Sequence, residues 1–222
     1  MIIIGITGAS GSGKTTLANS LKGHYGNDAE ILSEDNYYKD RSDIAKEKRL
    51  NLNYDVPAAF DHDLLVHDIN LLKKGSTIIP PSYEYSTGTR LPGKQSLKPC
   101  KILIVEGILI FSDTRLIELC DLKVYVDSSK DLSLIRRLSR DVTTRNLTLF
   151  YTLEKYKSVI RDSYLQYIRP QRSLENITII KNDLDQQAMD ISIITKNIAE
   201  ILAKNEQDQG NLIFNVYMNF CQ

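Results

Sequence analysis

The sequence has few cysteines, no excess charge of either sign and no long apolar run. Its three cysteines are odd in number, far apart and without a CxxC spacing, which argues against a disulfide framework or a zinc site. The 28 Lys and Arg residues balance 28 Asp and Glu residues, so the zero formal net charge gives no general attraction to nucleic acid. No apolar stretch approaches the roughly 18 residues of a membrane helix, and the first residues do not resemble a cleavable leader. We therefore expect a soluble, cytoplasmic protein without nucleic-acid or membrane partners.

The most informative motif is GASGSGKT at residues 8–15, a full match to the phosphate-loop pattern GxxxxGK[ST]. It follows the apolar run MIIIGIT, typical of a buried strand, and a helical apolar pattern runs from Thr16 to Tyr25. Backbone N–H groups of a loop in this position converge on phosphates, and the helix dipole favours the anion. The alternative is a glycine-rich turn that only joins strand to helix. The motif predicts a nucleotide-phosphate site at Gly8, Ala9, Ser10, Gly11, Ser12, Gly13, Lys14, Thr15 and Thr16.

Lys14 and Thr15 have separate roles in such a loop. The Lys14 ammonium is expected to lie near the β and γ phosphates, and the Thr15 hydroxyl to coordinate Mg²⁺.

The remaining chain alternates between strand and helix patterns. Strands are predicted at residues 29–33, 101–105, 122–126 and 177–180, and helices from 61 or 63 to 74, at 130–143, at 148–168 up to Pro170, and at 186–203. Residues 77–99 combine prolines and glycines with β-forming residues, which suggests a short hairpin outside the sheet. This alternation predicts an α/β fold of the phosphate-loop NTPase type, with a mostly parallel five-stranded sheet and helices on both faces.

A phosphate loop alone does not decide the reaction. The guanine-reading Asn-Lys-x-Asp of GTPases is missing, since Lys181-Asn182-Asp183 has the wrong order. The candidate acidic strand of an ATPase, Ile102 to Glu106, ends in a single Glu rather than in Asp or Asp-Glu. These observations favour a small-molecule kinase. Asp35, just beyond the strand at 29–33, would then point into the ligand crevice.

Five segments in series resemble the signatures of uridine-cytidine kinases. The resemblance runs from residue 1 to about residue 182, in the family's order and spacing. The matching segments are LSEDNYYK at 32–39, NYDVPAAFD at 53–61, PSYEY at 81–85, VEGIL at 105–109, and DSSKD at 127–131 followed by LIRRLSRD at 134–141.

The resemblance implies a nucleoside kinase that uses ATP or GTP with Mg²⁺. A sugar hydroxyl needs a carboxylate to accept its proton, and Asp35 matches the family's catalytic Asp, aided by Lys14 and Arg140. A capping role in the turn before Tyr37 is the alternative for Asp35. Glu106 matches the acid that binds Mg²⁺ with Thr15, and Gly107 beside it would allow a ligand to approach closely.

Further positions carry over from the same resemblance. Residues 130–147 would form a lid whose Arg140 and Arg145 close over the phosphates, although an arginine-rich helix face is by itself often only solvated. Asp55 and Arg137 would hold the ribose hydroxyls. Tyr38 and Tyr83 would wall the nucleoside pocket, with core packing as the alternative. The family also implies a homo-oligomer, a tetramer. We expect one kinase domain at 1–204 and a tail of unknown role at 205–222.

Three positions depart from the family pattern where it reads the base. Gly88 replaces a base-contacting His, Leu147 replaces the second Arg after the lid, and Lys155 replaces a Gln on the next helix. Deleting hydrogen-bonding partners relaxes discrimination, so we expect uridine and cytidine to be separated weakly. The departures leave two alternatives open: a related kinase with another small hydroxyl substrate, such as a sugar phosphate or a pantothenate-like alcohol, and a nucleotide-binding pseudo-kinase.

Overall fold

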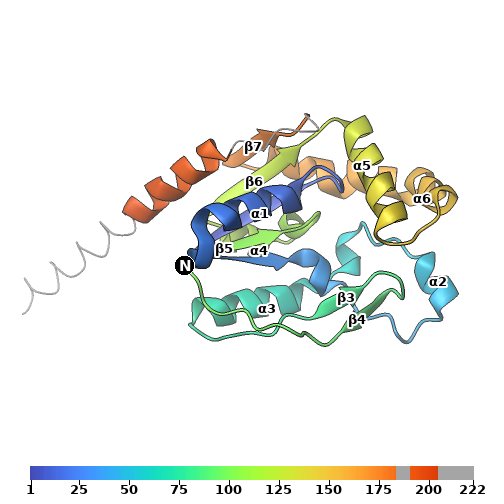
Figure 1. Ribbon diagram of the computed structural model, residues 1–222, viewed down its shortest axis with the longest axis horizontal. Coiled ribbons are helices and arrows are strands. Elements are labelled where there is room, and N and C mark those ends of the chain that lie inside the picture. Colours follow the sequence, from blue (N-terminus) through green and yellow to red (C-terminus); the bar gives the residue numbers. More distant parts are fainter. Residues whose placement is uncertain (184–190, 205–222) are drawn as a thin grey trace, which may run out of the picture.

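The computed structural model describes residues 1–183 and 191–204 (Figure 1). The predicted tail at 205–222 and the first residues of the helix predicted from 186 lie outside these ranges. The strands are β1 (Ile2–Gly8), β2 (Ala29–Ser33), β3 (Ser82–Glu84), β4 (Thr89–Leu91), β5 (Ile102–Glu106), β6 (Leu122–Asp127) and β7 (Ile177–Lys181). The helices are α1 (Lys14–Tyr25), α2 (Lys46–Leu50), α3 (His62–Lys73), α4 (Thr114–Leu119), α5 (Lys130–Thr143), α6 (Leu149–Lys155), α7 (Arg161–Ser163) and residues 192–204.

Five strands form one parallel sheet in the order β2-β5-β1-β6-β7. β1 is central, and all seven of its residues are buried. A parallel strand covered on both faces has no solvent-facing side, which explains why its sequence is apolar throughout rather than alternating. The predicted fold class is confirmed.

Helices cover both faces of the sheet (Figure 1). Ile4 of β1 packs in one core with Leu17 of α1 and Ile194 of the helix at 192–204. Its neighbour Ile3 points to the opposite core, which contains Ile69 of α3 and residues of α4. The period of two along β1 thus serves two hydrophobic layers.

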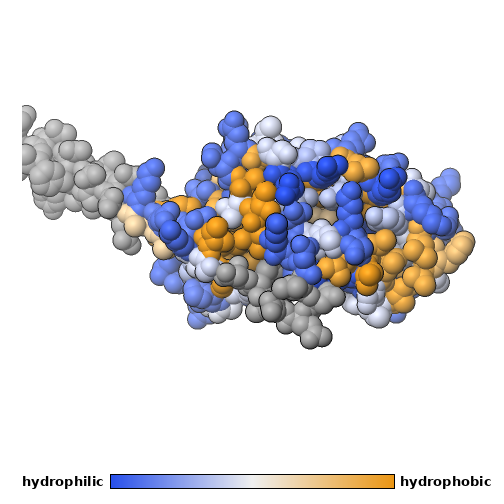
Figure 2. All heavy atoms as spheres, turned by 90° about the horizontal axis from the view of Figure 1, so that it is seen from above, coloured by the Kyte–Doolittle hydropathy of each residue, from blue (hydrophilic) through white to orange (hydrophobic). Residues whose placement is uncertain are grey.

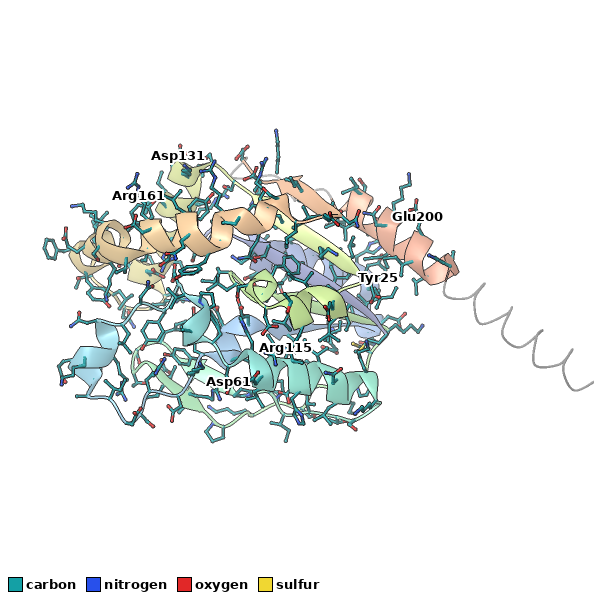
Figure 3. All side chains as sticks on the ribbon, turned by 180° about the vertical axis from the view of Figure 1, so that it is seen from behind. Tyr25, Asp61, Arg115, Asp131, Arg161 and Glu200 are labelled. Atoms are coloured by element: carbon teal, nitrogen blue, oxygen red, sulfur yellow. The ribbon has the colours of Figure 1, made fainter. Side chains whose placement is uncertain are left out.

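The hairpin of β3 and β4 forms a separate two-stranded sheet beside α3. The Arg90 guanidinium of β4 binds the Asp61 carboxylate at 3.0 Å. Asp61 lies at the start of α3 (Figure 3). The same guanidinium donates hydrogen bonds to the carbonyl oxygens of Tyr37 and Tyr38. Arg90 therefore fixes the hairpin against the segment that follows β2.

The predicted helix at 148–168 is confirmed in extent, since residues 149–168 are helical throughout, but its hydrogen-bond register changes along its length. After α6 the chain forms π-helical turns at Tyr156–Ile160 and Tyr164–Ile168, on either side of α7. Pro170 does not end the helical chain, because it lies in the first turn of a 3-10 helix at Arg169–Ser173, where its missing N–H is tolerated.

The surface mixes hydrophilic and hydrophobic residues, and a hydrophobic area lies at the end that carries α6 (Figure 2). Phe150, at the start of this helix, is 76% exposed. Within residues 1–183 and 191–204, no helix has the length and apolar character needed to cross a membrane.

Candidate active site

The phosphate loop lies between β1 and α1, as the motif predicts. Gly8, Gly11 and Gly13 have φ values of 143°, 84° and 100°, a region that residues with a Cβ rarely adopt. A Cβ on Gly11 would collide with the Ser133 carbonyl of α5, so this helix lies directly against the loop. The first turn of α1 has neither an acidic residue nor a side-chain cap, which leaves its N–H groups available to an anion.

Lys14 is held back over its own loop. Its ammonium group donates a hydrogen bond to the Ala9 carbonyl at 2.9 Å, and only 7% of the residue is exposed. Burial lowers the pKa of Lys14, while the negative charges of Glu106 and then Asp35 oppose this shift. The cation and the two carboxylates therefore share one electrostatic environment.

Glu106 ends β5 beside the neighbouring strand β2. Its Oε1 accepts a hydrogen bond from the Ser33 hydroxyl at 2.7 Å. Burial raises the pKa of Glu106, and the nearby charge of Asp35 adds to this effect. Ser33 was not among the predicted site residues.

The donor set at this end of β5 suits Mg²⁺ rather than a transition metal. Glu106 and Thr15 would contribute only oxygen atoms, which hard cations prefer. In the described part of the chain, no three His, Cys, Asp or Glu side chains gather into a metal cluster. Mg²⁺ commonly binds through one or two protein groups and completes its shell with water and substrate phosphates, so two ligands are sufficient.

Asp35 lies in the 3-10 turn Glu34–Tyr37 after β2. Its Oδ2 accepts a hydrogen bond from the Tyr85 hydroxyl at 2.5 Å and lies 3.7 Å from an Arg145 nitrogen. The Arg145 guanidinium also stacks on the Tyr85 ring, 3.7 Å from its centroid. Asp35 thus contacts the hairpin and the segment after the lid helix, and no side-chain hydrogen bond caps its own turn.

Gly107 has a different role from the one expected. A Cβ at this position would collide with the Glu34 side chain, so the glycine makes room for Glu34 rather than for a ligand. The Glu34 carboxylate is fully buried, and it accepts a hydrogen bond from the Leu109 N–H at 2.9 Å and contacts His62 at 2.8 Å. This buried pair fixes the turn that carries Asp35.

The lid arginines converge on Asp141, which the sequence interpretation missed. This carboxylate, 4% exposed, accepts from Arg140 at 2.8 Å and from Arg145 at 3.3 Å. Arg140 also donates to the Ser10 hydroxyl at 3.1 Å, which joins α5 to the phosphate loop. The signal was present in the sequence, because Asp141 is four residues from both Arg137 and Arg145, a spacing that places helical side chains together.

Asp55 and Arg137 form a buried ion pair. The guanidinium donates two hydrogen bonds to the carboxylate, at 2.6 Å and 3.3 Å. The two residues are 82 positions apart in the chain, so the resemblance alone brought them together in the sequence interpretation.

A cavity of about 120 Å³ opens beside this ion pair. Tyr38 and Tyr83 form part of its wall, with ring centroids 4.9 Å apart, and the Tyr54 ring packs edge-on against Tyr38. Tyr54 and Tyr85 were not predicted, although both belong to segments that carry the resemblance. The lining residues also include Asp55, Arg137, Asp141, Arg145, Gly88, Leu147 and Lys155.

Comparisons with known proteins agree with this geometry. The model of the Phosphoribulokinase / Uridine kinase family matches residues 3–186. The chain belongs to this family. A uridine kinase of Clostridium perfringens is 39% identical over 206 residues, which are 92% of this chain and 98% of that protein. A uridine kinase of Oceanobacillus iheyensis is 40% identical over 204 residues, 91% of this chain and 96% of that protein.

Solved structures support the fold of this family member. Phosphoribulokinase from Rhodobacter spheroides superposes with a TM-score of 0.57 at 22% identity, over 83% of this chain and 71% of that chain. D-glycerate 3-kinase from Cryptococcus neoformans gives a TM-score of 0.52 at 15% identity, over 85% of this chain and 89% of that chain. The predicted family is therefore confirmed, and its members are kinases, enzymes that use a nucleotide as phosphate donor.

Proposed function

We propose that this protein is a uridine kinase that transfers the γ-phosphate of ATP or GTP to the 5′-hydroxyl of uridine or cytidine, a step of pyrimidine salvage. One observation carries the proposal. The cavity that contains the Asp55–Arg137 pair is also lined by Tyr85 and Arg145, the two residues that contact Asp35. A nucleoside in this cavity would have its sugar between a diol-binding pair and a carboxylate next to the phosphate loop.

The ribose would be held through its vicinal hydroxyls. A carboxylate accepts and a guanidinium donates, so Asp55 and Arg137 together satisfy a diol whose groups do both. The 5′-hydroxyl would then face Asp35, which accepts its proton as the bond to phosphorus forms. The Tyr85 hydroxyl and Arg145, which contact Asp35 in the free protein, are the groups that the substrate would displace or share.

The phosphate side would be neutralised by cations from two elements. Lys14 of the loop and Arg140 and Arg145 of the lid would balance the charge of the transferring group. Mg²⁺ held by Thr15 and Glu106 would neutralise further phosphate charge. We also propose, as the resemblance implies, a cytoplasmic homo-tetramer without nucleic-acid or membrane partners.

The same chemistry suits two alternatives less well. A pseudo-kinase has no need for an acidic residue between the acceptor cavity and the phosphate loop, whereas Asp35 contacts two residues that line the cavity. A sugar phosphate or a pantothenate-like alcohol remains as a different acceptor. The buried Asp55–Arg137 pair, however, suits a neutral vicinal diol, which a nucleoside supplies.

An ADP-release assay over a panel of acceptors tests the proposal. The panel contains uridine, cytidine, 2′-deoxyuridine, a purine nucleoside, a sugar phosphate and pantothenate, each with ATP and with GTP. Uridine and cytidine should be phosphorylated, and 2′-deoxyuridine should be roughly 2- to 10-fold poorer in kcat/KM, since it lacks one hydrogen bond to the Asp55–Arg137 pair. Turnover of only the charged alcohols, or of no acceptor, would overturn the proposal.

A further inference from the structure

Three cations line the cavity, and two of them are paired with carboxylates. Arg137 binds Asp55, and Arg145 binds Asp141. Lys155 differs, because no described carboxylate lies within 4 Å of its ammonium group, whose one hydrogen bond is to the Leu52 carbonyl at 3.4 Å. Burial lowers its pKa, and no neighbouring acid offsets this shift. The cavity therefore holds a partly desolvated donor group that lacks a strong acceptor.

Two tyrosine hydroxyls are buried in the same cavity wall. Apart from a weak interaction between the two hydroxyls, those of Tyr54 and Tyr83 have no hydrogen-bond partner among the described residues. Burial raises the pKa of Tyr83, and the neighbouring Tyr54 adds to the shift, so Tyr83 is a neutral donor. Buried hydroxyls without a strong partner are uncommon in proteins, and these two are available to donate to a ligand in the cavity.

Gly88 shows how the wall differs from the family pattern. It turns the hairpin with a φ of 67°, and a Cβ built there would lie 3.2 Å from the Tyr54 hydroxyl oxygen. The position that the resemblance assigns to a His side chain therefore adjoins the Tyr54 hydroxyl. A Gly88→His variant would be strained in this backbone conformation, so it is a poor test of base recognition.

A hydrogen-bond donor that faces position 4 of a pyrimidine distinguishes uracil from cytosine. A lysine ammonium has three donors and no acceptor. Uracil presents a carbonyl oxygen at this position, whereas cytosine presents an amino group that itself donates. A donor facing a donor leaves both unsatisfied, and a site built on hydrogen bonds rejects such a ligand strongly.

We propose that Lys155, with the Tyr54 and Tyr83 hydroxyls, faces position 4 of the base, selects nucleosides that carry a 4-keto group, and so favours uridine over cytidine. This inference rests on the proposed nucleoside kinase activity and replaces the expectation of weak discrimination. That expectation was based on the hydrogen-bonding side chains of the family that are replaced at Gly88, Leu147 and Lys155. The cavity contains other donors in their place.

The test is the ratio of kcat/KM for uridine to that for cytidine. The native protein should favour uridine by about tenfold or more, and Lys155→Gln should reduce the ratio by on the order of tenfold, because an amide can both donate and accept. Lys157→Gln is the matched control: this lysine is two positions along, 70% exposed and paired with Glu154. It should leave the ratio unchanged.

Binding measurements on the same proteins separate the possible failures. Calorimetric titration with uridine and cytidine should show the same preference without nucleotide, and Tyr54→Phe should weaken uridine more than cytidine while the melting temperature stays near that of the native protein. Phosphorylation of both nucleosides with a ratio that Lys155→Gln does not change would overturn the inference and leave the kinase assignment intact. Absence of binding and turnover with any nucleoside would instead overturn the proposed function.

Discussion

At the scale of the residue, Asp35 is the group on which the proposed chemistry depends most. It contacts Tyr85 and Arg145, two residues that line the cavity, and its side chain does not cap its own turn. Asp35→Asn keeps the size of the side chain and removes its basicity, so kcat should fall by about 10²-fold or more while nucleotide binding is retained. Steady-state kinetics and a nucleotide-binding titration check this outcome. Asp43→Asn, an exposed control in the next segment, should behave as the native protein, and a native kcat for Asp35→Asn would return Asp35 to a structural role.

The raised pKa of Glu106 should make the Mg²⁺ requirement depend on pH. Burial holds the pKa of this carboxyl above its usual range, so protons compete with the metal at a higher pH than for an exposed Glu. As the pH falls from about 7.5 to about 5.5, the Mg²⁺ concentration for half-maximal activity should rise. Glu106→Gln should need more Mg²⁺ at every pH and respond less to pH. The control Glu118→Gln, at an exposed residue, should follow the native curve. If Glu106→Gln also followed the native curve, another group would hold the metal.

At the scale of the element, the turn after β2 depends on a buried pair from α3. His62 contacts the fully buried Glu34 at 2.8 Å, and its ring stacks on Phe60 with a centroid distance of 5.6 Å. Removing one partner of a buried ionisable pair leaves the other without compensation, so His62→Ala should lower the free energy of unfolding by about 3 kcal/mol. Urea denaturation measures this loss.

His67 is the matched control for that prediction. It lies on the same helix and is exposed, so His67→Ala should change the free energy of unfolding by about 0.5 kcal/mol or less. Equal losses in the two variants would show that the Glu34–His62 contact does not stabilise the turn.

The individual helices and strands show which parts of the fold can be predicted from the sequence. β1 and α1 follow from a motif with strong local rules, and the apolar runs at β5 and β6 are typical of buried parallel strands. The short helices α2 and α4 were missed because five or six residues carry too little periodicity to stand out. The π-helical turns between 156 and 168 were missed for a related reason: an apolar stripe predicts helical character but not the hydrogen-bond register.

At the scale of the whole molecule, the cavity is made by segments that are far apart in the sequence. The stretch at 52–55, the hairpin, the lid and α6 each contribute lining residues. No spacing rule brings such segments together, so the site residues in the sequence interpretation came from the resemblance. Ser33 and Tyr85 lie in segments that carry the resemblance, but their contacts with Glu106 and Asp35 are tertiary and were found only in the folded structure.

The position of the new phosphate on uridine tests the central claim most directly. If the Asp55–Arg137 pair holds the ribose diol and Asp35 accepts the proton, the product formed with ATP must carry its phosphate on the 5′-oxygen. Phosphorus-proton coupling in the NMR spectrum of the product identifies that oxygen. The account predicts uridine 5′-monophosphate alone; a 2′- or 3′-phosphate, or no phosphorylated uridine, would contradict it.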